Sequence, residues 1–278
     1  MTLVAMCSLK GSPGVTTAAL GLAGQWPSGH QPVVMECDPA GGDLLARYRL
    51  AISPGLVTLA AAGRRSTEPG LVWQHTQRLP GGLRVVPGPP SAGQAQAALE
   101  QLTSEETTMP RRAADRAGVV VIADCGRVEE SSPALPVLRQ ADALLVLVRA
   151  RDDALAHLAT MVNTVERWSA EPCFVLVGDG YRTDDVVREL GIEVAARLPE
   201  DKKGAAALSG ALGRRAAPAR SALGKALASL ADNLADRSAR TRRRGVGTLE
   251  ATGPNEYISL PWAGSPVVAA SSPDGSAS

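Results

Sequence analysis

The chain has 278 residues with 29 basic and 28 acidic side chains, so its net charge does not mark it as a nucleic-acid or membrane binder. Hydrophobic residues make up 45% of it, enough for one sizeable α/β domain or two small domains to bury a core. Its start, MTLVAMCSL, lacks a charged region and a cleavage site, and it predicts a strand rather than a signal peptide. No apolar run approaches the ~20 residues that span a bilayer. We therefore expect a cytoplasmic protein without a transmembrane segment.

The predicted strands are short apolar runs that alternate with helical patterns along the chain. Six such runs cover 3–8, 33–37, 83–86, 119–123, 143–148 and 174–177, and a weaker one covers 193–198. Helices are predicted at 16–25, 56–64, 92–102, 104–116, 132–140, 152–168 and 184–190. The strands are rich in Val and Leu without alternation, which is typical of strands buried on both faces of a parallel sheet. The pattern predicts an α/β fold with a doubly wound, mostly parallel sheet flanked by helices.

Four cysteines occur singly, within or just after apolar runs: Cys7, Cys37, Cys125 and Cys173. No two of them have the spacing of metal ligands, and a chain of this length does not need a disulfide framework. We expect buried thiols in a reducing compartment.

A last helix is predicted around 222–234, where leucines spaced by four, three and four form one stripe. Packing on the sheet and a membrane-seeking helix both fit this stripe, although the latter favours bulkier residues and lysines. The composition then shifts, so we predict a domain at 1–236 and a disordered tail rich in Arg, Gly, Ser and Pro at 237–278.

Two parts of this tail are candidate interaction segments. The basic run Arg240–Arg244 could hold nucleic acid or anionic lipid by salt-sensitive attraction, or be a solvated linker. A short aromatic segment at 255–264 contains Tyr257–Trp262 and is either a docking peptide for a protein partner or a stretch that folds back on the domain.

A glycine-rich stretch, KGSPGVTT, follows the first predicted strand and opens the first predicted helix. Glycines in such a loop let backbone N–H groups point toward phosphates at the positive end of the helix. The usual motif ends in Gly-Lys-Ser/Thr, in which the lysine binds phosphates and the hydroxyl binds Mg²⁺. Here Gly14 and Thr16 are present but Val15 stands in place of the lysine. A dehydrogenase-type loop would instead need a Gly-x-Gly opening.

Acidic residues follow two other predicted strands. Glu36 and Asp38 end the second strand, and Asp124 ends the strand VVVIAD. Carboxyl ends of parallel strands form the ligand-binding edge of a doubly wound sheet. Asp124 is thus a candidate to hold magnesium through water, and Asp38 to orient an attacking water.

With these motifs the chain resembles the ParA/MinD family of deviant Walker A ATPases over roughly residues 1–235. KGSPGVTT is similar to the family's Lys-Gly-Gly-x-Gly-Lys-Thr-Thr loop, ECDP to its Asp-x-Asp-Pro stretch, and VVVIADCG to its Walker B strand. LPED looks like the family's late loop near the base, which includes Pro199 and Asp201. The family also has a TadZ-type branch, linked to pilus and secretion ATPases, with eroded loops.

The resemblance implies a role for each matching residue. The implied nucleotide contacts are Lys10, Gly11, Ser12, Pro13, Gly14, Val15, Thr16, Thr17, Pro199 and Asp201. Lys10 would be the signature lysine that reaches the partner's phosphates in a homodimer, and Asp38 would be the catalytic carboxylate. The implied metal ligands are Thr16, Asp124 and Glu36. The implied cofactors are ATP or ADP and Mg²⁺, with the adenine preference resting on the resemblance alone.

Two loop positions depart from the family pattern. Val15 removes a charge-assisted contact worth ~1.5–3 kcal/mol, or about ten- to more than a hundredfold in affinity or rate. Ser12 adds a side chain where dimer partners approach. Lys10 could swing inward, but it cannot serve its own site and its partner's together. We therefore expect a nucleotide-dependent dimeric positioning switch with weak or absent ATP hydrolysis. The alternatives are a non-hydrolysing scaffold or regulator of a secretion or pilus machine, and a non-specific DNA-binding partitioning protein.

Overall fold

The computed structural model describes residues 2–169, 171–208 and 218–250, with the backbone alone for 218 and 241–250. The described residues up to Arg240 belong to one compact unit. Within the described residues, no helix is both long enough and apolar enough to span a membrane.

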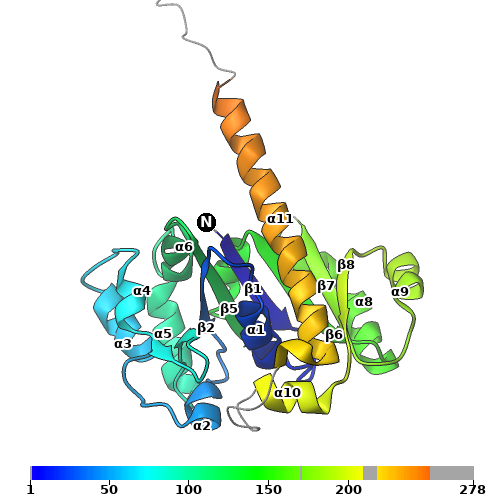
Figure 1. Cartoon of the computed structure of the whole chain (residues 1–278), viewed down its shortest axis with the longest axis horizontal. Helices are drawn as coiled ribbons and strands as arrows, with labels where there is room; N and C mark the ends of the chain where they lie inside the picture. Colours follow the sequence, from blue (N-terminus) through cyan, green and yellow to red (C-terminus); the bar gives the residue numbers. More distant parts are fainter. Residues whose placement is uncertain (1, 170, 209–217, 251–278) are drawn as a thin grey trace, which may run out of the picture. The chain divides into compact units, whose positions relative to one another are not determined.

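Eight strands form one sheet in the order β3-β4-β2-β5-β1-β6-β7-β8 (Figure 1). Their bounds are β1 Thr2–Ser8, β2 Gln31–Glu36, β3 Gln77–Arg78, β4 Arg84–Val86, β5 Val119–Arg127, β6 Ala143–Arg149, β7 Pro172–Val177 and β8 Val194–Leu198. All neighbouring pairs are parallel except β3 with β4. The central pairs place β1 between β5 and β6, so the loop after β1 lies at the middle of the sheet's carboxyl edge. The predicted doubly wound, mostly parallel sheet is confirmed.

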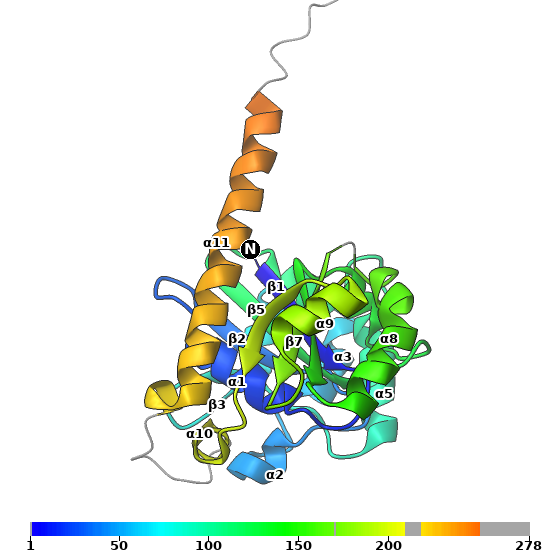
Figure 2. The ribbon, with the colours of Figure 1, turned by 90° about the vertical axis from the view of Figure 1, so that its right-hand side faces the viewer.

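Helices cover both faces of this sheet (Figure 2). Their bounds are α1 Val15–Gly24, α2 Leu44–Tyr48, α3 Leu56–Gly63, α4 Leu71–Gln74, α5 Ala92–Leu102, α6 Met109–Ala114, α7 Leu135–Arg139, α8 Asp152–Glu166, α9 Thr183–Leu190, α10 Lys202–Leu208 and α11 Ala222–Glu250. One apolar cluster lies under α1 and α11, and a second lies under α3, α5, α6, α7 and α8. In β1, Leu3 and Ala5 belong to the second cluster and Val4 and Met6 to the first. Burial on both faces explains why the strands lack polar alternation.

The leucine stripe of the last helix packs against the domain, on the face of the sheet that α1 covers. Its four leucines are buried in the cluster that contains α1: Leu223, Leu227, Leu230 and Leu234. Gly21 on α1 allows the close approach, because a Cβ there would collide with the Leu227 side chain. Burying each leucine contributes about 1.5–3 kcal/mol. The packed interpretation of this stripe therefore holds.

The last helix is longer than the composition indicated. It continues from Ala222 to Glu250 through residues 237–250, which the sequence-based prediction assigned to a disordered tail. Arg237 belongs to the domain, because its guanidinium pairs with Glu193 at 2.7 Å and with Glu171 at 3.5 Å. The expected aromatic segment at 255–264 lies outside the described residues.

Candidate functional site

The loop between β1 and α1 has the backbone of an anion cradle. Gly11 and Gly14 have positive φ values of 70° and 96°, which side-chain-bearing residues rarely adopt. Gly14 caps α1 in the left-handed conformation without a side-chain hydrogen bond, so no cap side chain occupies the first N–H groups of the helix. Apart from the glycine itself and its two chain neighbours, no described residue has an atom within 4 Å of the position a Cβ would take at either glycine. The start of α1 therefore presents backbone donors and a positive helix end toward open space.

Val15 occupies the position of the missing lysine but cannot take over its contact with phosphate. Its side chain is only 6% exposed and belongs to the apolar cluster under α1, together with Met6 and Leu147. The position where the motif carries a cation thus contributes to the core. The sequence reveals the substitution but does not reveal that the Val15 side chain points into the core.

Lys10 turns away from the loop that it belongs to. Its Nζ lies 3.2 Å from the Asp153 carbonyl oxygen and 3.5 Å from Asp153 Oδ2, at the start of α8. The Lys10 side chain is 48% exposed, and surface ion pairs of this kind are worth only about 0–1 kcal/mol. The pair can therefore exchange easily for another anion, but in this structure Lys10 does not cover its own cradle.

Asp124 is the buried acid of the site. Alternation along β5 directs it to the face that α1 covers, and its side chain is 1% exposed. Oδ1 accepts a hydrogen bond from Gly126 N at 3.2 Å, while Oδ2 has no hydrogen-bond partner among the described residues. Burial raises the pKa of Asp124 to about 6, and the nearby Thr16 hydroxyl opposes that shift without reaching hydrogen-bond geometry on Oδ2.

Asp38 lies directly over Gly126, a residue that sequence reasoning did not select. A Cβ at Gly126 would overlap the Asp38 carboxylate, and Gly126 has a positive φ of 56°. Asp38 Oδ1 also accepts a hydrogen bond from Ala40 N at 2.8 Å, and burial raises the pKa of its carboxyl. Gly126 thus bonds Asp124 with its N–H and makes room for Asp38, so it brings the two predicted carboxylates together.

Glu36 has a structural role rather than the predicted metal role. Its Oε1 accepts from Asp43 N at 2.8 Å and Leu44 N at 3.0 Å, and its Oε2 accepts from Gly88 N at 2.8 Å. Burial raises the pKa of Glu36 to about 7 despite these bonds. Because both oxygens already hold backbone donors, Glu36 anchors the start of α2 to the loop after β4.

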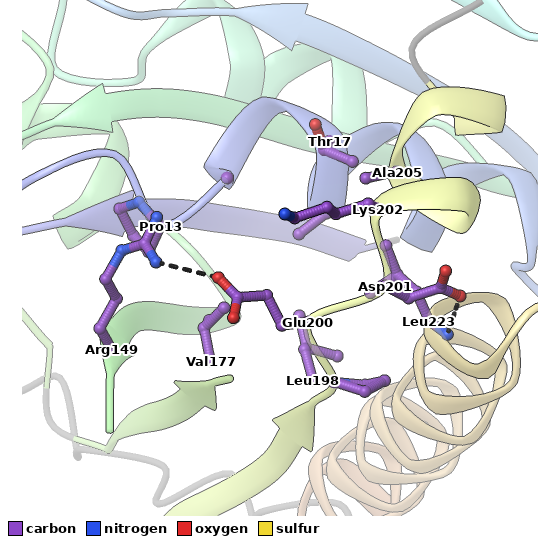
Figure 3. Close-up of a pocket in the computed structure, with 13 residues that line it drawn as sticks. Pro13, Thr17, Arg149, Val177, Leu198, Glu200, Asp201, Lys202, Ala205 and Leu223 are labelled. Carbon is purple, nitrogen blue, oxygen red and sulfur yellow. Dashed lines mark hydrogen bonds and ion pairs between the residues drawn. The ribbon is translucent and has the colours of Figure 1, made fainter. Parts of the chain in front are cut away.

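A pocket opens beside the loop, between α1 and the segment that follows β8 (Figure 3). Its volume is about 150 Å³, and its lining includes Pro13, Thr17 and Pro199. Arg149, at the end of β6, donates to the Ser12 carbonyl at 3.3 Å and pairs with Glu200 at 3.5 Å. The predicted contacts Pro13, Gly14, Thr17, Pro199 and Asp201 are all part of this lining.

Asp201 lies at this pocket but uses its carboxylate elsewhere. Oδ1 accepts from Gly204 N at 2.8 Å and Oδ2 from Leu223 N at 3.3 Å, and these backbone hydrogen bonds lower its pKa. Figure 3 shows the bond to Leu223 and the side chain of Lys202, which points toward the loop. Asp201 therefore ties α10 to α11, while Lys202 is a basic neighbour that sequence reasoning missed.

The residues present fit a magnesium ion that is shared with a phosphate group. Thr16 and the free Oδ2 of Asp124 offer two oxygen ligands, and Mg²⁺ usually takes few protein ligands together with waters and phosphate oxygens. Among the described residues no cluster of three or more His, Cys, Asp or Glu side chains could hold a metal alone. Such a site would thus hold Mg²⁺ with a bound phosphate rather than as a permanent structural ion.

Comparisons with known proteins agree with this architecture. No protein-family model matches the chain, and no curated protein sequence is significantly similar to it. Among solved structures, a ParA family ATPase from Chlorobium tepidum is similar with a TM-score of 0.67 and 17% identity, over 83% of this chain and 98% of that one. MinD from Pyrococcus horikoshii, complexed with Mg-ADP, has a TM-score of 0.64 and 14% identity, over 84% and 95%.

A third similar structure is the ATP complex of a McdA variant from Cyanothece, with a TM-score of 0.60 and 14% identity over 86% of this chain and 96% of that one. At such identities a structural likeness establishes the fold. The chain therefore has the fold of the ParA and MinD ATPases.

Proposed function

We propose that the chain binds a magnesium–nucleotide, ATP or ADP, at the loop of residues 10–17 and acts as a nucleotide-dependent dimeric positioning switch with weak or absent hydrolysis. The main support for a nucleotide site is the arrangement of three groups. The cradle at Gly14, the Thr16 hydroxyl and the unbonded Asp124 Oδ2 meet at the carboxyl edge of neighbouring parallel strands. Two similar structures, MinD and the McdA variant, were solved with Mg-ADP and with ATP.

Each residue of the site would have a separate task. The N–H groups at the start of α1 would bind phosphate oxygens, and Thr16 with Asp124 would hold the cation. Bound Mg²⁺ neutralises phosphate charge. Asp38 would orient a water beside the phosphate, because its carboxylate is partly buried and is fixed by Ala40 N.

Slow turnover follows from the side chains that are absent from the cradle. Val15 supplies no charge, and Lys10 is engaged with Asp153 of its own chain. Loss of one charge-assisted contact in the transition state slows a reaction by about ten- to more than a hundredfold. We therefore expect that exchange of bound nucleotide, rather than hydrolysis, determines whether the chain is monomeric or dimeric.

A dimer would release Lys10 from this pair. The weak, exposed bond to Asp153 can be exchanged for phosphate oxygens of a partner chain without a large free-energy loss. This supports the homodimer that the loop motif implies. The basic residues Arg240–Arg244 remain a proposed attachment point for nucleic acid or anionic lipid, and Tyr257–Trp262 for a protein partner.

A non-hydrolysing scaffold or regulator is the second candidate, and the burial of Val15 favours it. A core residue at the lysine position is compatible with a chain that acts through protein contacts in one constant state. The two candidates differ in how association responds to nucleotide. The switch predicts ATP-dependent dimers in light scattering, whereas the scaffold predicts association that ATP does not change.

The experiment combines binding, turnover and oligomeric state on the full chain. We expect saturable binding of Mg-ATP that weakens by tenfold or more in Thr16→Val, with unchanged binding in the surface control Thr160→Val. We also expect little phosphate release. Failure to bind nucleotide would overturn the proposal, and so would turnover comparable to an intact ParA ATPase that is abolished by Lys10→Ala and Asp38→Ala.

A further inference from the structure

Arg47 on α2 brings a positive charge to the phosphate side of the site. Its Nη1 lies 3.4 Å from Thr17 Oγ1, and its side chain is 29% exposed. The guanidinium is also close enough to Asp124 to oppose the rise in that carboxyl's pKa. Arg47 therefore contacts the start of α1 and acts electrostatically on Asp124, although it comes from a helix that sequence reasoning did not predict.

Other contacts hold α2 in place at both ends. Glu36 fixes its start through the N–H groups of Asp43 and Leu44, and the Tyr48 hydroxyl donates to the Leu208 carbonyl at its end. The Asp43 carboxylate accepts from Arg47 Nη2 at 2.7 Å. The guanidinium is thus pre-oriented, and its remaining N–H groups are available to a ligand because arginine carries five donors.

Of the three other basic side chains near the loop, Lys202 lines the pocket beside α1 (Figure 3), and the other two are engaged with groups outside the cradle. Lys10 is directed to Asp153. Arg149 donates to the Ser12 carbonyl and pairs with Glu200. In the described part of the chain, neither side chain contacts Thr17 or shifts the pKa of Asp124. Of these side chains, Arg47 is the one that both contacts Thr17 and opposes the rise in the pKa of Asp124.

We infer that Arg47 supplies the phosphate-binding cation that the loop lacks at Val15. This inference rests on the proposed nucleotide site and assigns it a further binding residue. The planar guanidinium suits a phosphate group better than a point charge does, because it can donate two parallel hydrogen bonds. The cation would then come from α2, after Asp38 in the chain, instead of from the start of α1.

The test compares Arg47→Gln with Arg49→Gln in the full chain. Arg49 is an exposed arginine two residues away whose side chain makes no hydrogen bond or ion pair with any described residue, so the two variants lose the same charge. Calorimetric titration with Mg-ATP, and with magnesium tripolyphosphate as a probe without a base, gives the affinities. We expect Arg47→Gln to weaken both by about tenfold or more and Arg49→Gln by less than about threefold.

A second arm tests the same geometry without removing the arginine. Asp43→Asn frees the donors that Asp43 occupies, so we expect tighter Mg-ATP binding by about two- to fivefold. The tightening should vanish in the double variant Asp43→Asn/Arg47→Gln, because the effect depends on the guanidinium. This arm stays informative if Arg47→Gln fails to fold alone.

The outcomes separate this inference from the function on which it rests. Mg-ATP binding that Arg47→Gln leaves unchanged, or that Arg49→Gln weakens equally, would overturn the role of Arg47 and leave the nucleotide site intact. No tightening in Asp43→Asn would also count against it. Absence of nucleotide binding by the unaltered chain would overturn the proposed function and this inference together.

Discussion

Val15→Lys should strengthen nucleotide binding and weaken the nucleotide-free fold. Val15 is 6% exposed in the apolar cluster under α1, so its loss removes a buried side chain worth about 1.5–3 kcal/mol. The lysine stem recovers part of this by packing its methylene groups while the ammonium reaches the open edge of the cradle. We expect the free energy of unfolding to fall by about 1–2 kcal/mol.

The gain in binding comes from one charge-assisted contact to phosphate. Such a contact is worth ~1.5–3 kcal/mol, which corresponds to about ten- to more than a hundredfold in the dissociation constant of Mg-ATP. Calorimetric titration measures the affinity, and urea unfolding measures the stability. Val15→Met is the matched control, since it lengthens the side chain without adding charge. Equal affinity in the folded Lys and Met variants would contradict a phosphate-binding cradle whose own loop lacks a cation at position 15.

Three further substitutions test the geometry. Gly126→Ala should cost about 1–2 kcal/mol in urea unfolding because of its positive φ, and should displace the Asp38 carboxylate and lower any residual phosphate release. An unchanged free energy of unfolding in Gly126→Ala would contradict the strain expected at this position. Gly21→Leu should overpack the contact with Leu227 and lower the free energy of unfolding by about 1–3 kcal/mol. An unchanged free energy would mean that α1 and α11 are not in contact in solution. Glu36 has a pKa raised from 4.5 to about 7, so the stability from it is present below about pH 4.5 and lost as pH rises through 7. Between pH 4.5 and 8 the free energy of unfolding should therefore fall by about 3 kcal/mol less in Glu36→Gln than in the unaltered chain. Parallel curves for the two proteins would argue against a raised pKa of Glu36.

The sheet and the cradle could be predicted because their signals are local. Val and Leu runs define the strands, and Gly14 with Thr16 directly follows one of them. Asp124 could be placed at the ligand edge because every parallel strand ends there. Those predictions needed only the order of residues along the chain.

The parts that sequence reasoning missed depend on contacts between distant residues. Glu36 was expected to bind metal, but its carboxylate is taken by the backbone of Leu44 and Gly88, and no local pattern reveals those donors. Arg47 reaches Thr17 only because of how α2 is anchored. The continuation of α11 past residue 236 was missed because the overall composition was weighed above the helix-forming tendency of its five arginines.

Whether Mg²⁺ strengthens nucleotide binding is the decisive property of the proposed site. ATP should be titrated into the full chain with and without Mg²⁺, and in parallel into Asp124→Asn, which keeps the size of the side chain but removes the carboxylate. We expect saturable binding that Mg²⁺ strengthens in the unaltered chain and fails to strengthen in Asp124→Asn. Absence of binding, or the same response to Mg²⁺ in both proteins, would contradict it.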